Sequence, residues 1–427
     1  MIKFRFVFLV FAISLLAKIA FSGDTIRVMH YNLLYYDKNT SFCTSTNNNV
    51  DLKDGYLRTI TGHYQPDIFT VNEMNGSVTS VSRLLNNVFN VGDVSHYKRA
   101  NYTGSYLVNI LYYNSQKLEM HSQNYILTSP RLTDVYRLYY KSDNLELGDT
   151  TFITCIVTHL KAGNTPTDQA DRSQAAGQIM NYINNRGMQG NILFMGDFNV
   201  YTSSEPAFQT FMTPTSSGVR FYDPVNALGD WQNDPAFAQY HTQSTHNSST
   251  SSGCHSTGGM DDRFDFILAT ESVLEGTRGL KYIDDSYWAF GQDGNRLNQT
   301  LTNPPNNSLP SNVINALFNM SDHLPVVMEL HIDSDLYTST STQPLNNNRL
   351  KVTNPFQSTI DIWSSNTKEE AVNIQVINLL GAIVLEKRVN LYPGEKTSVE
   401  ANSLSPGIYL FRAEGSNLRM VSKIIKQ

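Results

Sequence analysis

Several apolar, strand-like runs in the first 333 residues each carry a polar side chain of a catalytic type at one end. The runs are NILFMGDFN, DDRFDFILA, SDHLPVVMEL, TIRVMHYNLL, PDIFTVNEM and TTFITCIVTHLKAG. Period-two alternation and a high content of Val, Ile and Thr are typical of strands. Because α/β folds place chemistry at strand ends and in the loops that follow them, the pattern predicts an α/β protein with one polar site.

The polar residues at these ends are the types that metal-assisted hydrolysis of a phosphoester requires. In chain order they are Asn32, Glu73, His159, Asp197, Asn199, Asp265, Asp322 and His323. A lone Asp-His pair is usually part of a surface turn, so the prediction depends on all of the clusters occurring together.

This series resembles the endonuclease/exonuclease/phosphatase superfamily, which includes deoxyribonuclease I, exonuclease III, bacterial sphingomyelinases and inositol polyphosphate phosphatases. The resemblance covers about Thr25 to Asp333. It implies a catalytic domain over residues 24–333 with a deoxyribonuclease I-like fold, a four-layer sandwich of two mixed β-sheets flanked by helices. One flanking helix is predicted after Thr165, which would cap it, with Pro166 at its first position.

The resemblance and the side-chain chemistry together suggest a metal site. Glu73 is the strongest candidate ligand, since hard carboxylate oxygens suit Mg²⁺ or Mn²⁺, with Ca²⁺ as a supporting ion. Asn32 and Asp322 would complete or support the coordination. For Asn32 the alternative is an amide that only caps the next turn.

The remaining candidates would act on the attacking water and the phosphate. Asp197 would orient or deprotonate the water, and Asn199 would bind the phosphate from the same side of the chain. His323 needs a partner that fixes its tautomer, and Asp265 is the natural one. His159 would donate to the nonbridging phosphate oxygens, where charge develops in the transition state, unless it is merely structural.

Arg137 and three histidines are weaker candidates. Arg137 stands where relatives often carry a phosphate-binding arginine, but Leu138 replaces the proline that often follows it. The polar stretch before Met260 contains His241, His246 and His255. Their spacing matches no zinc motif, although a zinc site is the alternative interpretation.

Residues 1–22 have the composition of a signal peptide. Lys3 and Arg5 precede an apolar run, and Ala20-Phe21-Ser22 supplies a small-residue cleavage site. The apolar run stops at Lys18, short of the ~20 residues that a membrane span requires. We therefore expect export, with no stable insertion in the membrane.

Three cysteines follow this segment, so at most one intramolecular disulfide can form. Cys155 lies on a predicted strand, where a buried thiol acts as a small hydrophobe. An exported protein permits a bridge between Cys43 and Cys254, but spacing alone does not fix the pairing.

The sequence changes character after Asp333. Residues 334–350 are rich in Ser, Thr and Asn, which is typical of a flexible linker. Residues 351–427 contain short alternating runs separated by turn residues, which predicts a small C-terminal all-β sandwich.

This C-terminal region resembles the sorting domain of the type IX secretion system of Bacteroidetes-type bacteria. The resemblance lies in Asn354-Pro355-Phe356, in Gly407-Ile408-Tyr409, and in a basic terminus with Lys423 and Lys426. It implies the type IX machinery as a partner and a secreted or cell-surface location. The alternative is an immunoglobulin-like accessory or carbohydrate-binding module.

Charge and motif details rank the substrates without deciding among them. Residues 24–333 contain 19 Lys and Arg against 30 Asp and Glu, a net charge of −11, so no basic stripe supports tight binding of polyphosphate. The run Met260–Asp265 lacks the Trp-Cys-Asp-Arg of inositol phosphatases. The leading hypothesis is a monomeric extracellular nuclease that degrades DNA, with RNA as a further substrate. A sphingomyelinase-like or other phosphodiesterase is the alternative, and a noncatalytic surface binding protein is a remote one.

Overall fold

The structure, a computed structural model, describes residues 23–142, 150–213, 218–248, 253–332, 350–364, 369–379, 381–415 and 419–427. The chain divides into two compact units, the first ending at Asp335 and the second beginning at Leu336. The predicted signal peptide, residues 1–22, lies outside the described residues, as does nearly all of the predicted linker. Leu350, predicted as the last linker residue, instead begins the first strand of the second unit.

One mixed sheet of the first unit is built around its N-terminal strand. The strand order is β11-β13-β1-β2-β4-β3, and β12 also pairs with β13. Only β1 and β2 run parallel to each other. The strands are β1 (Asp24–Tyr36), β2 (Ile68–Asn75), β3 (Tyr97–Arg99), β4 (Leu107–Asn114), β11 (Leu280–Tyr282), β12 (Trp288–Ala289) and β13 (Val326–Ile332).

The second sheet of this unit is also mixed, in the order β5-β6-β7-β8-β10-β9. Here β7 and β8 are the parallel pair. Cys155 and Val157 on β7 face the core shared with the first sheet, whereas Ile156 faces a second core beneath α3 and α4, as strand alternation requires. The strands are β5 (Leu118–Ile126), β6 (Thr133–Tyr140), β7 (Phe152–His159), β8 (Ile192–Asp197), β9 (Phe221–Tyr222) and β10 (Asp265–Thr270).

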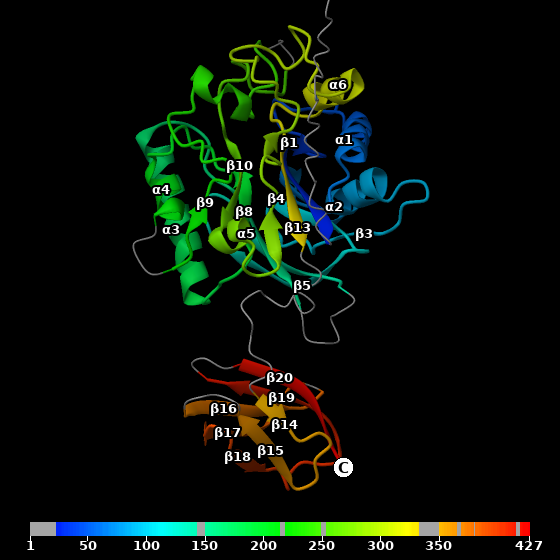
Figure 1. The fold of residues 1–427 in the computed structure, drawn as a ribbon. Helices are drawn as coiled ribbons and strands as arrows, with labels where there is room; N and C mark the ends of the chain where they lie inside the picture. The colour runs from blue at the N-terminus through cyan, green and yellow to red at the C-terminus, as the bar shows by residue number, and fades with distance from the viewer. Residues whose placement is uncertain are drawn as a thin grey trace, which may run out of the picture. The chain divides into compact units, whose positions relative to one another are not determined.

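Helices cover the outer faces of the two sheets. In Figure 1, α1, α2 and α6 lie on the side of the first sheet, and α3 and α4 lie on the side of the second. This arrangement confirms the predicted four-layer sandwich. The helical segments are α1 (Val50–Tyr64), α2 (Val78–Leu84), the π-helical η1 (Leu85–Phe89), α3 (Pro166–Asn185), α4 (Pro206–Met212), the 3₁₀ segment η3 (Pro235–Tyr240), α5 (Glu271–Glu275) and α6 (Ser311–Met320).

Helix α3 begins where the sequence predicted it. The Thr165 side chain accepts from the backbone N–H of Asp168, and the Asp168 carboxylate accepts from the backbone N–H of Thr165, which is a capping box. Pro166 occupies the first turn, where its missing N–H costs nothing. Among the described residues, no helix has the length and apolar character needed to cross a membrane.

The second unit is an all-β sandwich, as predicted. Its two sheets have the orders β14-β15-β18 and β17-β16-β19-β20, and a single apolar cluster fills the space between them. Ile360, Ile374 and Phe411 are fully buried members of that cluster. The strands are β14 (Leu350–Val352), β15 (Thr359–Ser364), β16 (Glu370–Ile377), β17 (Ile383–Leu391), β18 (Lys396–Glu400), β19 (Gly407–Glu414) and β20 (Arg419–Lys426).

Candidate active site

Three adjacent strands of the second sheet place His159, Asp197 and Asp265 side by side. The pairing register matches His159 on β7 with Asp197 on β8, and Asp197 with Asp265 on β10. Across the sandwich, the Asn72 amide oxygen on β2 accepts from the backbone N–H of Asp197 at 2.8 Å. Because Asn72 directly precedes Glu73, this bond joins the acidic ends of both sheets.

A pocket of 320 Å³ opens where these strand ends meet. It is lined by Leu34, Tyr35, Glu73, His159, Ala162, Gly163, Asp197, Asn199, Tyr201, Gln243, Cys254, Ser256, Phe264, Asp322 and His323. Two other pockets on this unit are larger, at 610 and 660 Å³. Among the described residues, neither brings together carboxylates and histidines close enough to share an ion.

Glu73, His159 and Asp197 form a group that fits a divalent cation. Their ligand atoms all lie within 4.8 Å of one another, and His159 Nε2 lies 3.8 Å from Glu73 Oε1 and 3.4 Å from Asp197 Oδ2. Glu73 Oε2 and His159 Nδ1 are buried with no hydrogen-bond partner among the described residues. Burial and the Asp322 carboxylate raise the pKa of Glu73, so a nearby positive charge would favour its ionised form.

Asn32 and Asp322 lie at the same pocket but have different surroundings. The Asn32 amide donates to Asp197 Oδ2 at 3.0 Å, and its oxygen accepts the backbone N–H of Leu34 at 3.0 Å. Asp322 Oδ2 accepts the backbone N–H of Ser256 at 2.8 Å, whereas its Oδ1 is buried and unpartnered in the described part of the chain. Asp322 therefore has one carboxylate oxygen free to bind an ion. Both polar atoms of the Asn32 side chain already make hydrogen bonds, one of which positions Asp197.

His323 is held by Asp265 and faces Asp197. Its Nδ1 lies 2.6 Å from Asp265 Oδ2, and its Nε2 lies 3.8 Å from Asp197 Oδ2. Burial alone would lower the pKa of His323, but the Asp265 carboxylate, with Asp197 and Asp322, outweighs it and raises the pKa well above its ordinary value. The Gln243 side-chain amide lies 2.7 Å from Nε2 and can take either hydrogen-bond role.

The Gly196-Asp197-Phe198-Asn199 turn fixes the Asp197 carboxylate. The backbone N–H of Asn199 donates to Asp197 Oδ1 at 3.0 Å, and Asn199 adopts a left-handed conformation with φ 51°. A Cβ at Gly196 would lie 1.9 Å from the Thr158 carbonyl oxygen, so only glycine allows β8 to pass β7 this closely. Burial, with the nearby Asp265 and Glu73 carboxylates, raises the pKa of Asp197 to about 7.

His159 ends β7 inside the pocket and is neutral by its surroundings. Burial lowers its pKa well below the ordinary value, and Arg131 and His323 act in the same direction. Arg131 Nη1 donates to the carbonyl oxygens of His159 and Leu160 at 3.3 and 3.0 Å. The guanidinium therefore holds the strand end that carries the histidine.

Arg137 is not brought to this group. It lies on β6 opposite Thr154 and exposed to solvent, with its guanidinium 4.0 Å from the centroid of the Phe152 ring. That register position lies five residue steps, about 17 Å, along the strand from His159. Arg131, which was missed, is the arginine beside the pocket. The only sequence signal for it was its position just before a strand that pairs with β7.

Lys53 is a second residue that the sequence analysis missed. Its Nζ donates to the carbonyl oxygens of Leu33 and Leu34 at 2.9 and 2.6 Å. Leu34 and Tyr35 are left-handed, with φ 45° and 52°, which is strained for residues with a Cβ. Burial lowers the pKa of Lys53 to about 7, although the Asp322 and Glu73 carboxylates oppose this effect. Lys53 thus supports the strained turn that carries Tyr35 into the pocket.

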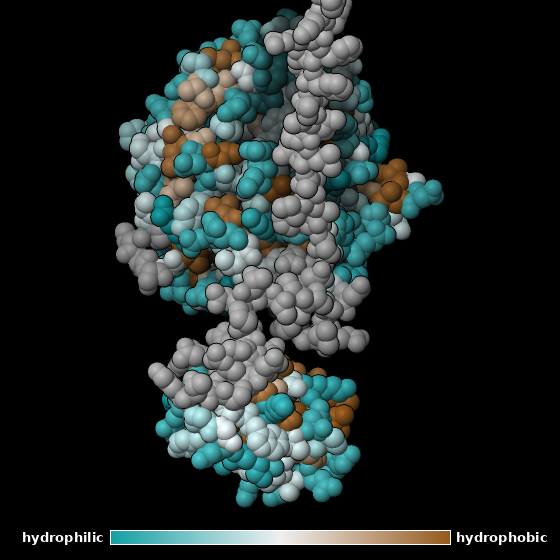
Figure 2. Space-filling view, viewed as in Figure 1, coloured by the Kyte–Doolittle hydropathy of each residue, from teal (hydrophilic) through white to brown (hydrophobic). Residues whose placement is uncertain are grey.

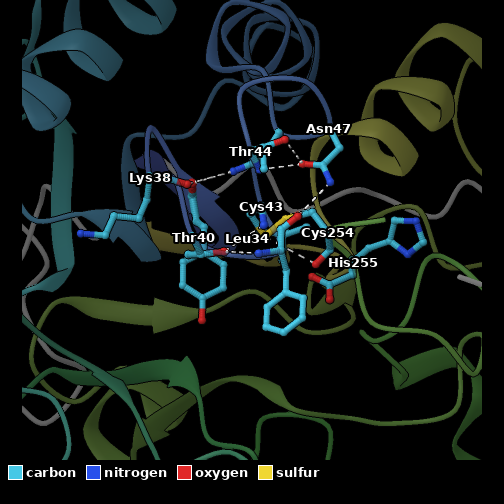
Figure 3. The surroundings of a disulfide bond; sticks show 12 residues. Leu34, Lys38, Thr40, Cys43, Thr44, Asn47, Cys254 and His255 are labelled. Carbon is cyan, nitrogen blue, oxygen red and sulfur yellow. Dashed lines mark hydrogen bonds between the residues drawn. A yellow bond between two sulfur atoms is a disulfide. The ribbon is translucent and has the colours of Figure 1, made fainter. Parts of the chain in front are cut away.

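A disulfide joins two loops at the pocket. Cys43, in the loop after β1, is bonded to Cys254, which lines the pocket, and their Cα atoms are 4.7 Å apart. Figure 3 shows the bond between the two loops, with Lys38 extending to one side and His255 lying on the other. Cys155 is buried and free, as expected for a small hydrophobe, and burial raises the pKa of its thiol.

The three histidines before Met260 do not gather around a common point. Both ring nitrogens of His241 face backbone carbonyl oxygens, those of Met260 at 3.2 Å and Trp231 at 2.8 Å. His246 and His255 stack with ring centroids 3.7 Å apart. Within the described ranges, the group of Glu73, His159 and Asp197 is the one that could hold a metal, so the zinc alternative gains no support.

Comparison with known proteins identifies the C-terminal region. Residues 354–427 match the family described as secretion system C-terminal sorting domain, which confirms the resemblance seen in the sequence and indicates secretion or display at the cell surface. No curated protein matches this chain in sequence.

Several solved structures are similar to this chain at low identity. The human Nocturnin catalytic domain with bound sulfate is 16% identical with a TM-score of 0.45, covering 72% of this chain and 94% of its own. An endonuclease/exonuclease/phosphatase from Bacteroides vulgatus is 16% identical with a TM-score of 0.44, covering 72% and 99%. D. rerio TDP2 complexed with a single-strand DNA product is 13% identical with a TM-score of 0.46, covering 72% and 98%.

Proposed function

We propose that this chain is a secreted, divalent-metal-dependent phosphodiester hydrolase, and that its substrate is nucleic acid, with DNA as the leading candidate and RNA as a further one. One observation carries the proposal. His323, held by Asp265 at 2.6 Å, faces the Asp197 carboxylate at 3.8 Å, inside a pocket that also holds His159 and Glu73. Asp197 as a base, the oriented imidazole of His323 and a cation site at Glu73 therefore all line the same pocket.

The cation site is proposed from the atoms that the protein leaves free. Glu73 and Asp322 each keep one buried carboxylate oxygen without a partner among the described residues. Mg²⁺ and Mn²⁺ prefer such oxygens. Of the Glu73, His159 and Asp197 group, we therefore assign Glu73 to the ion, together with the free oxygen of Asp322 in the same pocket and with Asn32 as a supporting group. His159 and Asp197 remain available for the phosphate and the water. When bound, a divalent ion supplies neutralisation of the charge that develops on the phosphate.

The remaining groups are placed to handle the proton and the phosphate. Asp197 is fixed at both oxygens, by Asn32 and by the backbone of Asn199, so its remaining lone pairs can orient and deprotonate a water molecule. Although burial acts the other way, the Asp265 carboxylate raises the pKa of His323, which favours the charged imidazolium, and its Nε2–H can then donate to a phosphate oxygen. Burial lowers the pKa of His159, which favours the neutral ring, and that ring can donate one N–H to a second oxygen. Asp265 acts through His323, so it is a positioning residue.

Export fits a nuclease that works outside the cell. The sorting domain over residues 354–427 supports secretion or surface attachment through a dedicated machinery. The Cys43–Cys254 disulfide is the type of bond that persists in an oxidising compartment. Residues 1–22 would supply the signal for crossing the inner membrane.

A substrate panel tests the proposal. The purified secreted protein is incubated with plasmid DNA, RNA, sphingomyelin and a chromogenic phosphodiester, each with Mg²⁺ or Mn²⁺ and with or without added Ca²⁺. We expect DNA and RNA to be degraded, at rates that fall as salt rises, because the phosphate contacts are electrostatic. Turnover of sphingomyelin without nucleic-acid cleavage would overturn the substrate assignment. Full activity in excess chelator would overturn the metal assignment.

A further inference from the structure

Two exposed aromatic side chains near the pocket have no role in the chemistry above. Phe42 is 76% exposed and Tyr106 is 70% exposed. A single exposed ring is common on protein surfaces, but two rings beside one pocket offer a ligand a shared aromatic contact. A third ring, Tyr35, lines the pocket itself.

Phe42 lies in a loop that is held by side-chain hydrogen bonds. Thr40 Oγ1 accepts the backbone N–H groups of Phe42 and Cys43 at 3.1 and 2.8 Å, and the Asn47 side chain donates to the Phe42 carbonyl oxygen at 2.9 Å. The neighbouring Cys43 is bonded to Cys254 in the pocket wall (Figure 3). Since successive Cα atoms are about 3.8 Å apart and the two cysteine Cα atoms 4.7 Å apart, the Phe42 Cα lies within about 8.5 Å of the Cys254 Cα.

Tyr106 is held against the loop that follows Glu73. The backbone N–H of Gly76, three residues after Glu73, donates to the Tyr106 carbonyl oxygen at 3.1 Å. A Cβ at Gly76 would lie 1.8 Å from the Ser105 carbonyl oxygen, so the two loops can meet this closely only with glycine. Lys38 Nζ lies 3.6 Å from the centroid of the Tyr106 ring, which places a cation beside an exposed aromatic face.

Tyr35 links these rings to the reactive groups. It is half-buried in the pocket, on the strained turn that Lys53 supports. Burial and the Glu73 carboxylate raise the pKa of Tyr35, and Arg131 and Tyr106 are close enough to affect it as well. Tyr35 and Glu73 therefore line the same pocket.

We propose that Tyr35, Phe42 and Tyr106 form an aromatic rim that stacks unpaired nucleobases next to the scissile phosphate, so that the enzyme prefers single-stranded nucleic acid to duplex. This inference rests on the proposed function. In a duplex the base faces are already stacked on one another, whereas an unpaired base has a free face for an aromatic side chain. Stacking is also insensitive to the charge of −11 on residues 24–333, which opposes binding through phosphates alone.

A lipid surface is the competing occupant, because exposed aromatic residues also insert into membranes. Membrane insertion favours a continuous apolar patch, but the rim is interrupted by polar neighbours, including Lys38, Thr40 and Asn47. On the face shown in Figure 2, hydrophobic side chains of the first unit are likewise scattered among hydrophilic ones. Aromatic rings with a lysine beside them, next to a pocket that holds carboxylates and histidines, fit a nucleic-acid strand better.

Binding without turnover tests the rim directly. In the Asp197→Asn background with Mg²⁺, fluorescence polarisation would compare a labelled single-stranded oligonucleotide with the same sequence as a duplex. We expect the single strand to bind at least about 10-fold more tightly, and Phe42→Ala or Tyr106→Ala to remove about 10-fold of that affinity, with Phe42→Trp restoring it. Tyr392→Ala, an exposed tyrosine of the second unit, should change nothing.

The outcomes separate the rim from the function on which it rests. If the wild-type protein hydrolyses neither a chromogenic phosphodiester nor any nucleic acid, the proposed function fails. If it cleaves nucleic acids but binds single strand and duplex equally, or if Phe42→Ala and Tyr106→Ala bind like the parent, only the rim is wrong. Loss of binding to sphingomyelin vesicles in these two variants, with oligonucleotide binding intact, would assign the rim to a lipid surface.

Discussion

The two units bury different kinds of groups. Fully buried polar side chains are concentrated in the first unit, where Asp197, Asp265, His323 and Arg263 are almost inaccessible to water. Among the described residues of the second unit, Ser364 and Lys426 are the only buried polar ones. A catalytic pocket has to remove charged groups from water and pair them, whereas a sorting domain needs only an apolar core and a recognisable surface.

Backbone strain follows the same division. Every described residue other than glycine with a positive φ lies in the first unit, and Leu34, Tyr35, Glu73 and Asn199 line the pocket. In the described part of the second unit, only Gly381 and Gly394 adopt positive φ. Strained residues persist where the surroundings hold them, and here they collect where the chemistry is proposed.

The strongest test of this contrast is Glu73→Gln. Loss of the carboxylate charge should weaken the cation site and reduce phosphodiester hydrolysis by about three orders of magnitude or more, with the fold intact. Steady-state kinetics with a chromogenic phosphodiester and thermal unfolding measure the two effects. Glu329→Gln, on the half-exposed partner of Arg27, is the matched control and should retain activity. Wild-type turnover by Glu73→Gln in excess chelator would refute the metal mechanism.

The buried pair should act as a unit. We expect His323→Ala and Asp265→Ala each to reduce kcat/KM by about 100-fold or more, and the double variant to be little worse than His323→Ala, because Asp265 acts only through the imidazole. A double-mutant cycle gives the coupling. A double loss equal to the product of the two single losses would show that the 2.6 Å contact has no catalytic consequence.

Substitutions at two arginines compare Arg131, which lies beside the site, with Arg137, which is remote from it. Arg131→Ala should lower kcat/KM by about 10-fold to 100-fold, since the guanidinium holds the strand end carrying His159 and adds positive charge beside the pocket. Arg137→Ala is the matched control and should be close to wild type. The reverse result would restore the assignment made from the sequence.

The Lys53→Met variant tests whether the strained backbone at Leu34 and Tyr35 depends on the hydrogen bonds from Lys53. Without the ammonium donor, the carbonyl oxygens of Leu33 and Leu34 lose a buried partner, and we expect about a 10-fold fall in kcat/KM with a Tm lower by several degrees. Lys53→Arg, which keeps donors and charge, should recover part of both. A loss of stability with unchanged kinetics would make Lys53 purely structural.

Removal of residues 351–427 should have the smallest effect on chemistry. The two units have separate apolar clusters, so we expect the truncated enzyme to hydrolyse a phosphodiester at the wild-type rate but to remain in the periplasm. The intact mass of the natural extracellular protein should show that the C-terminal region has been removed. Retention of Gln427 on that protein would instead support an accessory module.

Much of the first unit could be predicted because its strands show an apolar alternating pattern and polar residues of catalytic types lie near their ends. Eight of the nine predicted site residues are brought together, since each lies at, or within a few residues of, the point where the regular pairing of an apolar strand stops. Arg137 is the exception, because an arginine within a strand gives no indication of how far it lies from the strand's end. Arg131 is found beside the pocket only through its bonds to the carbonyl oxygens of His159 and Leu160.

Features created by tertiary packing could not be predicted. Lys53 lies on a helix, where a lysine usually faces solvent, and only the turn at Leu34 explains its burial. Gln243 reaches His323 from a loop with no periodic pattern. The pairing of Cys43 with Cys254 likewise depends on loops that meet across the pocket, so spacing alone left it open.

The disulfide also constrains the unfolded state of the oxidised chain. Its two cysteines are 211 residues apart, so the bond closes a loop that spans most of the first unit in the unfolded chain. In the chain-entropy description, closing a loop of this length reduces the conformational entropy of the unfolded chain. At 25 °C this raises the free energy of the unfolded state by about 5 kcal/mol. The oxidised chain thus keeps the two sides of the pocket within reach of each other even when every strand has come apart.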